Sequence, residues 1–116
     1  MNNHVYTEAE KAQATALLER GRDIVGAGWI KGSMAKMRDG RECSASNPLA
    51  CKFCSLGAIE RSASELKSSS NVKRLAKQRL QYVMGNGIIA RNDSSRTSKA
   101  MVYGAFDLAF LGAAGF

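Results

Sequence analysis

The sequence predicts a single α+β domain over residues 1–116, mostly helical, with about four helices and one β-hairpin. Three observations favour this fold class. Apolar residues recur at spacings of three and four in several segments, which is typical of amphipathic helices. An Asp-Gly pair marks a tight hairpin turn. A chain of 116 residues that is 45% hydrophobic can bury one core without a metal ion or disulfides.

The first helix is expected to begin after Thr7, because Thr7 and Glu10 form a capping box that satisfies two backbone N–H groups. It should end near residue 27, which stands between Gly26 and Gly28. Its apolar residues share one face, which we predict to be buried: Ala14, Leu17, Leu18, Ile24 and Val25.

A hairpin and a second helix should follow. The segment from about 30 to 44 contains the Asp39-Gly40 turn and is predicted to form the hairpin, with Trp29 packed between it and the helices. Asn47 and Pro48 are expected to start the second helix, the asparagine as cap and the proline at the first helical position. Gly57 in mid-helix is unfavourable by about 1 kcal/mol relative to alanine, so we expect it to permit close approach of another element.

The second half of the chain is predicted to hold two further helices. A serine-rich loop ends at Asn71, which should cap an amphipathic third helix that stops at the glycines 85 and 87. A loop then carries Asn92 and Asp93. The last helix, about 98–111, is apolar around nearly its whole circumference, so it should be central in the core or shared with a second molecule. A homodimer through this helix is therefore one expectation, with candidate interface residues Phe106, Phe110, Leu111 and Phe116.

Positive charge is concentrated in residues 66–99, which carry eight basic residues and one acidic residue and so account for the whole net charge of +7. Clustered cations raise the local potential toward phosphates or carboxylates. The predicted partner-binding residues are Lys67, Lys73, Arg74, Lys77, Arg91, Arg96 and Lys99. A solvated helix face is the alternative interpretation of the same charges.

Several short motifs stand in an order that resembles a family of small uncharacterised proteins from bacteria and their phages. The resemblance rests on Trp29 with Gly32 and Ala35, the turn Asp39-Gly40, Cys54 with Gly57 and Ala58, the pair Asn92-Asp93, and Phe106-Asp107. It supplies no established activity. It implies a protein borne by a phage or mobile element, for which binding to a host component and interfering with it is a common role.

These observations together predict a small, basic, non-catalytic binding protein. We expect it to dock through the cationic helix and loop on an acidic surface of a host protein or protein–nucleic-acid complex and to modulate or inhibit it. The alternative is direct, sequence-independent binding of nucleic acid, which would weaken steeply with salt. Only Tyr82 supplies an aromatic ring in the basic stretch, so stacking on single strands is not expected.

The three cysteines suggest a third interpretation. Cys51 and Cys54 stand three residues apart at a predicted helix start, where the helix dipole and Lys52 would favour thiolates, and Cys43 lies upstream. A structural zinc site needs a fourth ligand, and His4 is the one histidine available to complete it. A zinc-stabilised interaction module is therefore the third alternative, although packed thiols fit the same sequence and no metal or other cofactor is expected.

Catalysis and membrane insertion are not expected. The carboxylates do not cluster, and the Gly85–Gly87 segment lacks the lysine and hydroxyl residue of a phosphate-binding loop. No run of eighteen apolar residues and no signal-peptide pattern occurs. With an odd number of cysteines, a fully paired disulfide framework cannot form, so the cytoplasm of a host cell is the expected location.

Overall fold

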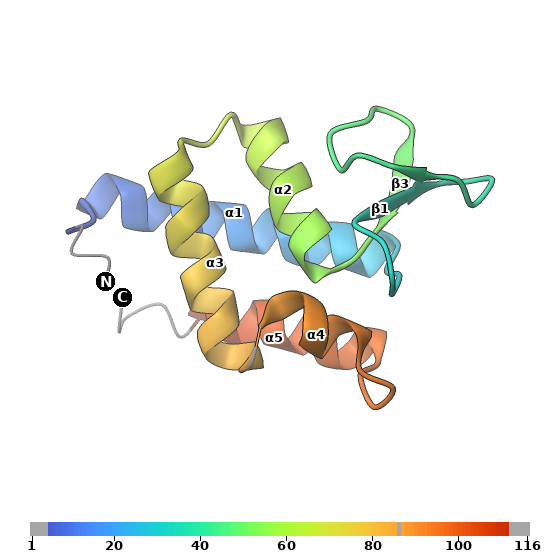
Figure 1. Ribbon diagram of the computed structural model, residues 1–116. Helices are drawn as coiled ribbons and strands as arrows, with labels where there is room; N and C mark the ends of the chain where they lie inside the picture. The colour runs from blue at the N-terminus through green and yellow to red at the C-terminus, as the bar shows by residue number, and fades with distance from the viewer. Residues whose placement is uncertain (1–4, 86, 112–116) are drawn as a thin grey trace.

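One long helix, α1 (Glu8–Ala27), runs through the middle of the molecule and contacts most of the other elements. The computed structural model of the protein describes residues 5–85 and 87–111. Helices α2 (Ser55–Leu66) and α3 (Ser70–Met84) pack on one side of α1, and α5 (Lys99–Leu111) packs along another (Figure 1). The short α4 (Ile88–Asp93) lies between α3 and α5 in the chain. The predicted fold class, α+β and mostly helical, is confirmed.

The first helix forms as predicted. The Thr7 hydroxyl accepts a hydrogen bond from the Glu10 N–H at 3.0 Å, and the Glu10 carboxylate accepts one from the Thr7 N–H at 2.8 Å. All five residues of the predicted face are buried in the core. The capping box and the apolar spacing are interactions between near neighbours in the sequence, which is why both could be predicted.

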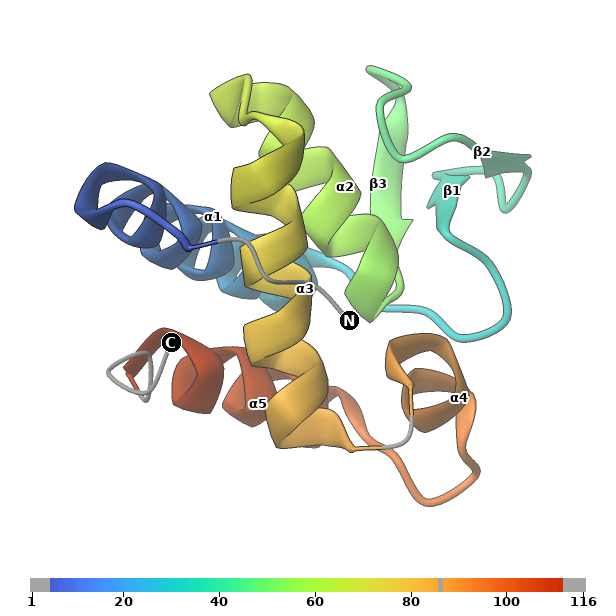
Figure 2. The ribbon, with the colours of Figure 1, turned by 60° about the vertical axis from the view of Figure 1, so that its left-hand side comes forward.

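The hairpin is confirmed, but it belongs to a larger sheet. Strands β1 (Ala35–Met37) and β2 (Glu42–Cys43) pair antiparallel around the Asp39-Gly40 turn, where Gly40 has a φ of +91°. A third strand, β3 (Ala50–Phe53), pairs antiparallel with the other edge of β1 and gives the order β2-β1-β3. Figure 2 shows this sheet beside α2, and Figure 1 shows it next to the carboxyl end of α1.

The prediction that the second helix starts at Asn47 and Pro48 was wrong, because this segment leads into β3. The Asn47 side chain accepts from the Leu49 N–H at 2.8 Å, so it closes a turn rather than capping a helix. In β3, the Phe53 N–H donates to Gly28 at 3.0 Å and the Phe53 carbonyl accepts from Ile30 at 3.2 Å. These partners lie far away in the sequence, and they hold the segment extended until Cys54 caps α2.

Gly57 does allow the close approach that its position predicted. A Cβ at residue 57 would lie 1.9 Å from the carbonyl oxygen of Met34, just before β1. The same Met34 carbonyl accepts a hydrogen bond from the Cys54 N–H at 3.2 Å. The first turn of α2 is thus pressed against the sheet, and only glycine fits at this contact.

Two details of the carboxyl-terminal half differ from the prediction. α3 begins earlier than expected, because the Ser69 hydroxyl, not Asn71, caps it by accepting from the Val72 N–H at 3.2 Å. Asn92 and Asp93 lie in α4 rather than in a loop. Within the described part of the chain, every helix is too short or too polar to cross a membrane.

Candidate functional site

The seven predicted partner-binding cations fall into two groups rather than one patch. Lys67 follows α2, and Lys73, Arg74 and Lys77 lie on the first half of α3. Arg91 lies on α4, which follows the opposite end of α3 (Figure 1), Arg96 lies in the connection to α5, and Lys99 is the first residue of α5. Because α3 rises about 1.5 Å per residue, about 20 Å separates its two ends. The predicted cations therefore lie in two separate groups, one near each end of α3.

Two of the α3 cations are already engaged. Lys73 and Lys77 each donate to the Glu60 carboxylate at 2.9 Å. Burial works to raise the pKa of Glu60, but the hydrogen bonds and charges of the two lysines outweigh it, and the pKa lies below its ordinary value. The Glu60 carboxylate therefore stays charged near neutrality, and it offsets part of the positive charge on this face of α3.

Arg79 is not on the surface at all. Its side chain is only 2% exposed, and its guanidinium donates to the Lys11 carbonyl at 3.3 Å and to the Thr15 hydroxyl at 2.8 Å. Desolvation lowers its pKa. No described carboxylate lies within ion-pair distance of it. One of the eight basic residues in the charged stretch is thus a structural link between α3 and α1.

The second group is exposed and carries uncompensated charge. We call Arg91, Arg96 and Lys99 the α4–α5 cations. All three are exposed, and among residues 5–85 and 87–111 none of them forms an ion pair. The Thr97 hydroxyl donates to the Arg91 carbonyl at 2.6 Å and fixes the connection between α4 and α5. Their charge is therefore available to a partner.

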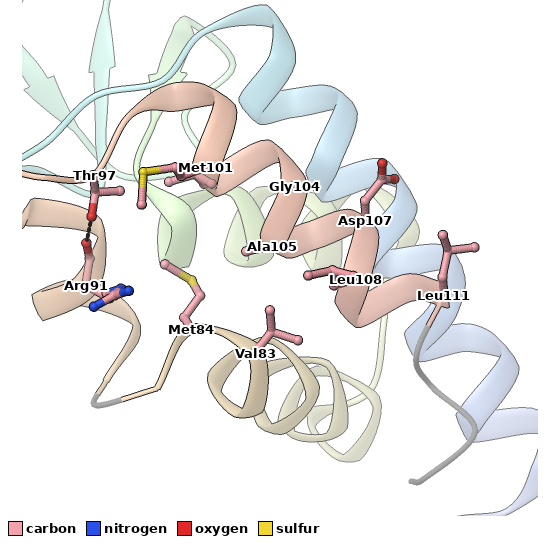
Figure 3. A pocket seen from close by; sticks show the side chains of 11 residues that line it. Val83, Met84, Arg91, Thr97, Met101, Gly104, Ala105, Asp107, Leu108 and Leu111 are labelled. Atoms are coloured by element: carbon pink, nitrogen blue, oxygen red, sulfur yellow. Dashed lines mark hydrogen bonds between the residues drawn. The ribbon is translucent and has the colours of Figure 1, made fainter.

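An apolar groove that Arg91 helps to line lies between the end of α3 and the outer face of α5. This α5 groove has a volume of about 570 Å³. Val83 and Met84 line it from α3, Met101 and Leu108 line it from α5, and these side chains point into the same space (Figure 3). Arg91 stands at one end, and Leu111 stands at the other (Figure 3).

The predicted interface residues of the last helix differ in how far they are buried. Phe106 is fully buried, and the prediction that it forms an interface was wrong: its ring lies where Gly21 leaves space on α1, 2.7 Å from the position of a Cβ. Phe110 is half-buried, with the Arg22 guanidinium 5.8 Å from its ring centre. Leu111 is 73% exposed and lines the α5 groove. Phe116 lies outside the described residues.

A hydrogen-bond network, which we call the Asn92 junction, connects three of the motif residues, Trp29, Asn92 and Asp93. The Asn92 side-chain oxygen accepts from the Trp29 indole N–H at 2.7 Å and from the Ser55 N–H and hydroxyl at 2.9 and 2.6 Å. Its amide nitrogen donates to the Ile30 carbonyl at 3.1 Å and to Asp93 at 2.9 Å. Trp29 thus packs between sheet and helices, as predicted, but its polar contact to α4 was missed, because it needs a partner 63 residues away.

The cysteines do not converge. Cys54 is buried and caps α2, with its sulfur accepting from the Gly57 N–H at 3.2 Å. Burial raises the pKa of this thiol, so the prediction of a thiolate does not hold there. Cys51 is exposed on β3, and Cys43 is half-buried on β2. In the part of the chain that the structure describes, no three His, Cys, Asp or Glu side chains gather as metal ligands; His4 lies outside that part.

Comparison with known protein families shows to which family the chain belongs. The model of DUF6197, a family of unknown function, matches residues 9–110, so the chain belongs to this family. This confirms the resemblance to an uncharacterised family, while an origin in bacteria or phages stays a prediction. No curated protein matches the chain. No solved structure matches it.

Proposed function

We propose that this member of a family of unknown function is a small, basic, non-catalytic binding protein. It docks through the α4–α5 cations on an acidic surface of a host protein or protein–nucleic-acid complex, and it modulates or inhibits that target. One observation carries the proposal: Arg91, Arg96 and Lys99 are exposed and unpaired among the described residues, whereas Lys73 and Lys77 are held by Glu60. The resemblance described above supports a phage or mobile-element origin and action in the host cytoplasm.

The number of cations in the α4–α5 group, which is three, favours a protein over nucleic acid as partner of this surface. Three phosphate contacts would give a slope of log K against log salt of about −2.7, compared with about −5 to −9 for proteins that make six to ten contacts. Binding through the α4–α5 cations alone would thus be weak at physiological salt. The α5 groove beside them offers an apolar surface, which a phosphate backbone does not use and a protein partner does.

The Asn92 junction supports the non-catalytic part of the proposal. Its polar groups, which include the buried Ser55 and Asn92 and the exposed Asp93, form hydrogen bonds with one another and with backbone groups. Buried polar groups satisfied in this way stabilise one arrangement of the chain. They act here as a link between three elements.

Two charge-reversed variants test the docking surface. In the first, Arg91, Arg96 and Lys99 are changed to glutamate. In the matched control, Lys36, Arg38 and Lys52 of the sheet region are changed to glutamate, which lowers the net charge by the same amount. Each protein is immobilised, and captured host proteins are identified by mass spectrometry. Labelled single- and double-stranded nucleic acids are titrated in parallel from low to physiological salt.

We expect one or more host proteins to be captured by the wild type and by the sheet variant but not by the α4–α5 variant. Nucleic acid should bind weakly and lose affinity to a similar degree in both variants. If both variants lose the host protein equally, net charge rather than the α4–α5 surface is responsible. If nucleic acid binds tightly at physiological salt and only the α4–α5 variant loses it, direct nucleic-acid binding becomes the better account.

A further inference from the structure

The outer face of α5 exposes a continuous apolar stripe. Met101, Gly104, Leu108 and Leu111 follow one another at spacings of three, four and three, so they share one side of the helix. Met101 is 48% exposed and Leu108 is 61% exposed. A Cβ added at Gly104 would meet nothing within 4 Å, which leaves the middle of the groove wall open. Side chains of this size normally gain from burial, so the stripe is suited to a partner.

The groove has the dimensions of a short helix. From Met101 to Leu111, α5 rises about 15 Å, or roughly three turns. The opposite wall, Val83 and Met84, comes from α3, so a segment laid between α3 and α5 would contact both helices. An amphipathic helix with apolar side chains at i, i+4 and i+7 places three anchors over about 10.5 Å, which fits within this length.

The charges around the groove favour an occupant with negative charge. Arg91 stands at one end, next to Arg96 and Lys99 in the chain. The carboxylate that borders the groove, Asp107, is paired with Arg22 at 2.7 Å and so contributes little free negative charge. A second copy of the chain would bring the same three cations and another net charge of +7 to the contact. Repulsion between like charges disfavours that occupant.

We propose that the α5 groove binds an amphipathic helix of the partner protein whose apolar stripe packs against Met101 and Leu108 and whose acidic residues face Arg91. This inference rests on the proposed function and adds the form of the partner to it. The apolar contacts supply most of the affinity, because they are removed from water, and the acidic flank supplies orientation and specificity.

The test uses two synthetic helical peptides of about 15 to 20 residues, long enough to form a helix in isolation. Both carry leucines at helical spacing, one with glutamates and the other with lysines at the flanking positions. Binding to the full chain is measured by fluorescence anisotropy. Leu108→Glu tests the apolar stripe, with Leu49→Glu as control, because Leu49 is 69% exposed near β3 and distant in the fold. Arg91→Glu tests the charge, with Arg38→Glu as control.

We expect the acidic peptide to bind, and the lysine peptide to bind at least about tenfold more weakly. Leu108→Glu and Arg91→Glu should each weaken the acidic peptide by about tenfold or more, and each control by less than about twofold. Light scattering should show a monomer in the absence of peptide.

Three results would overturn the inference, and a fourth would contradict the proposed function. The lysine peptide could bind as well as the acidic one. Binding could depend on Arg91 and not on Leu108, in which case the proposed function stands and the groove is not the site. The chain could be a dimer that Leu108→Glu dissociates, in which case a second copy covers the groove. Dependence on Leu108 without dependence on Arg91 would instead contradict the proposed cationic docking.

Discussion

A single methyl group at Gly57 should destabilise the fold, although alanine is the better helix former. Gly57 lies in the first turn of α2, where its Cα faces the carbonyl of Met34. An ideal Cβ there would be 1.9 Å from this oxygen. An ordinary carbon–oxygen contact needs about 3.3 Å, so α2 and the chain before β1 must separate by more than about 1 Å in Gly57→Ala.

The size of the effect follows from three contributions. Helix propensity favours alanine by about 1 kcal/mol. Separation weakens the hydrogen bond from the Cys54 N–H to the Met34 carbonyl, now 3.2 Å long, which is a loss of about 1 kcal/mol. Overpacking of a well-packed contact is unfavourable by about 1 to 3 kcal/mol. The net result is a destabilisation of about 1 to 3 kcal/mol, or a fall in Tm of roughly 4 to 12 °C for a domain of this size.

Gly104→Ala is the matched control, because Gly104 is also helical and an added Cβ there meets nothing within 4 Å. Its Tm should rise by a few degrees, since the propensity gain of about 1 kcal/mol is unopposed. Thermal unfolding is followed by circular dichroism, and urea unfolding gives the free energy. If Gly57→Ala is as stable as Gly104→Ala, the close contact between α2 and the sheet does not exist.

Three further predictions concern acid stability, thiol reactivity and the Asn92 junction. Hydrogen bonding from Arg20 holds the pKa of Glu65 below its ordinary value. The charged Glu65 therefore stabilises the fold above its unfolded pKa of about 4.3, and this stabilisation is lost as the pH falls through the folded pKa. In Glu65→Gln, the free energy of unfolding measured with urea should fall less steeply below about pH 5 than in the wild type. A thiol reagent should modify exposed Cys51 first and leave buried Cys54 untouched until the chain unfolds; equal rates by mass spectrometry would contradict this order. Asn92→Asp replaces a buried donor with a carboxylate oxygen beside Asp93, and urea unfolding should show a loss of about 3 kcal/mol or more.

Features set by near neighbours in the sequence could be predicted. The capping box of Thr7 and Glu10 and the buried face of α1 depend on residues three or four positions apart. The Asp39-Gly40 turn depends on the positive φ that glycine accepts. Gly57 was also informative, because a glycine retained inside a helix indicates a close neighbour even when the neighbour is unknown.

Features set by distant partners could not be predicted in the same way. Residues 50–53 have no clear alternation of apolar and polar side chains, and they become a strand because they pair with β1, while Phe53 also bonds to residues 28 and 30. Asn92 resembles a loop residue until its partners are known. For Phe106, Gly21 was the missed signal, because a glycine within α1 leaves room for a ring from α5.

The candidate site illustrates the same division. Charge in the sequence located the basic stretch, but it could not show that Glu60 engages Lys73 and Lys77 or that Arg79 is buried. Whether cations are available to a partner depends on the carboxylates that the fold places beside them. Among the described residues Lys67 and Arg74 are also exposed and without an ion pair, so the functional proposal rests on Arg91, Arg96 and Lys99 because these three follow one another around α4 and the start of α5.

The Asn92 junction and the proposed binding surface are physically linked through α4. Asn92 fixes this short helix to Trp29 and Ser55, and Arg91 is the preceding residue on it. The Thr97 hydroxyl holds the Arg91 carbonyl and so ties α4 to the start of α5. A six-residue helix has little stability of its own. The position of Arg91 at the end of the α5 groove thus depends on the hydrogen-bond network beside it, so we expect Trp29 and Asn92 to affect the proposed binding by holding Arg91 in place.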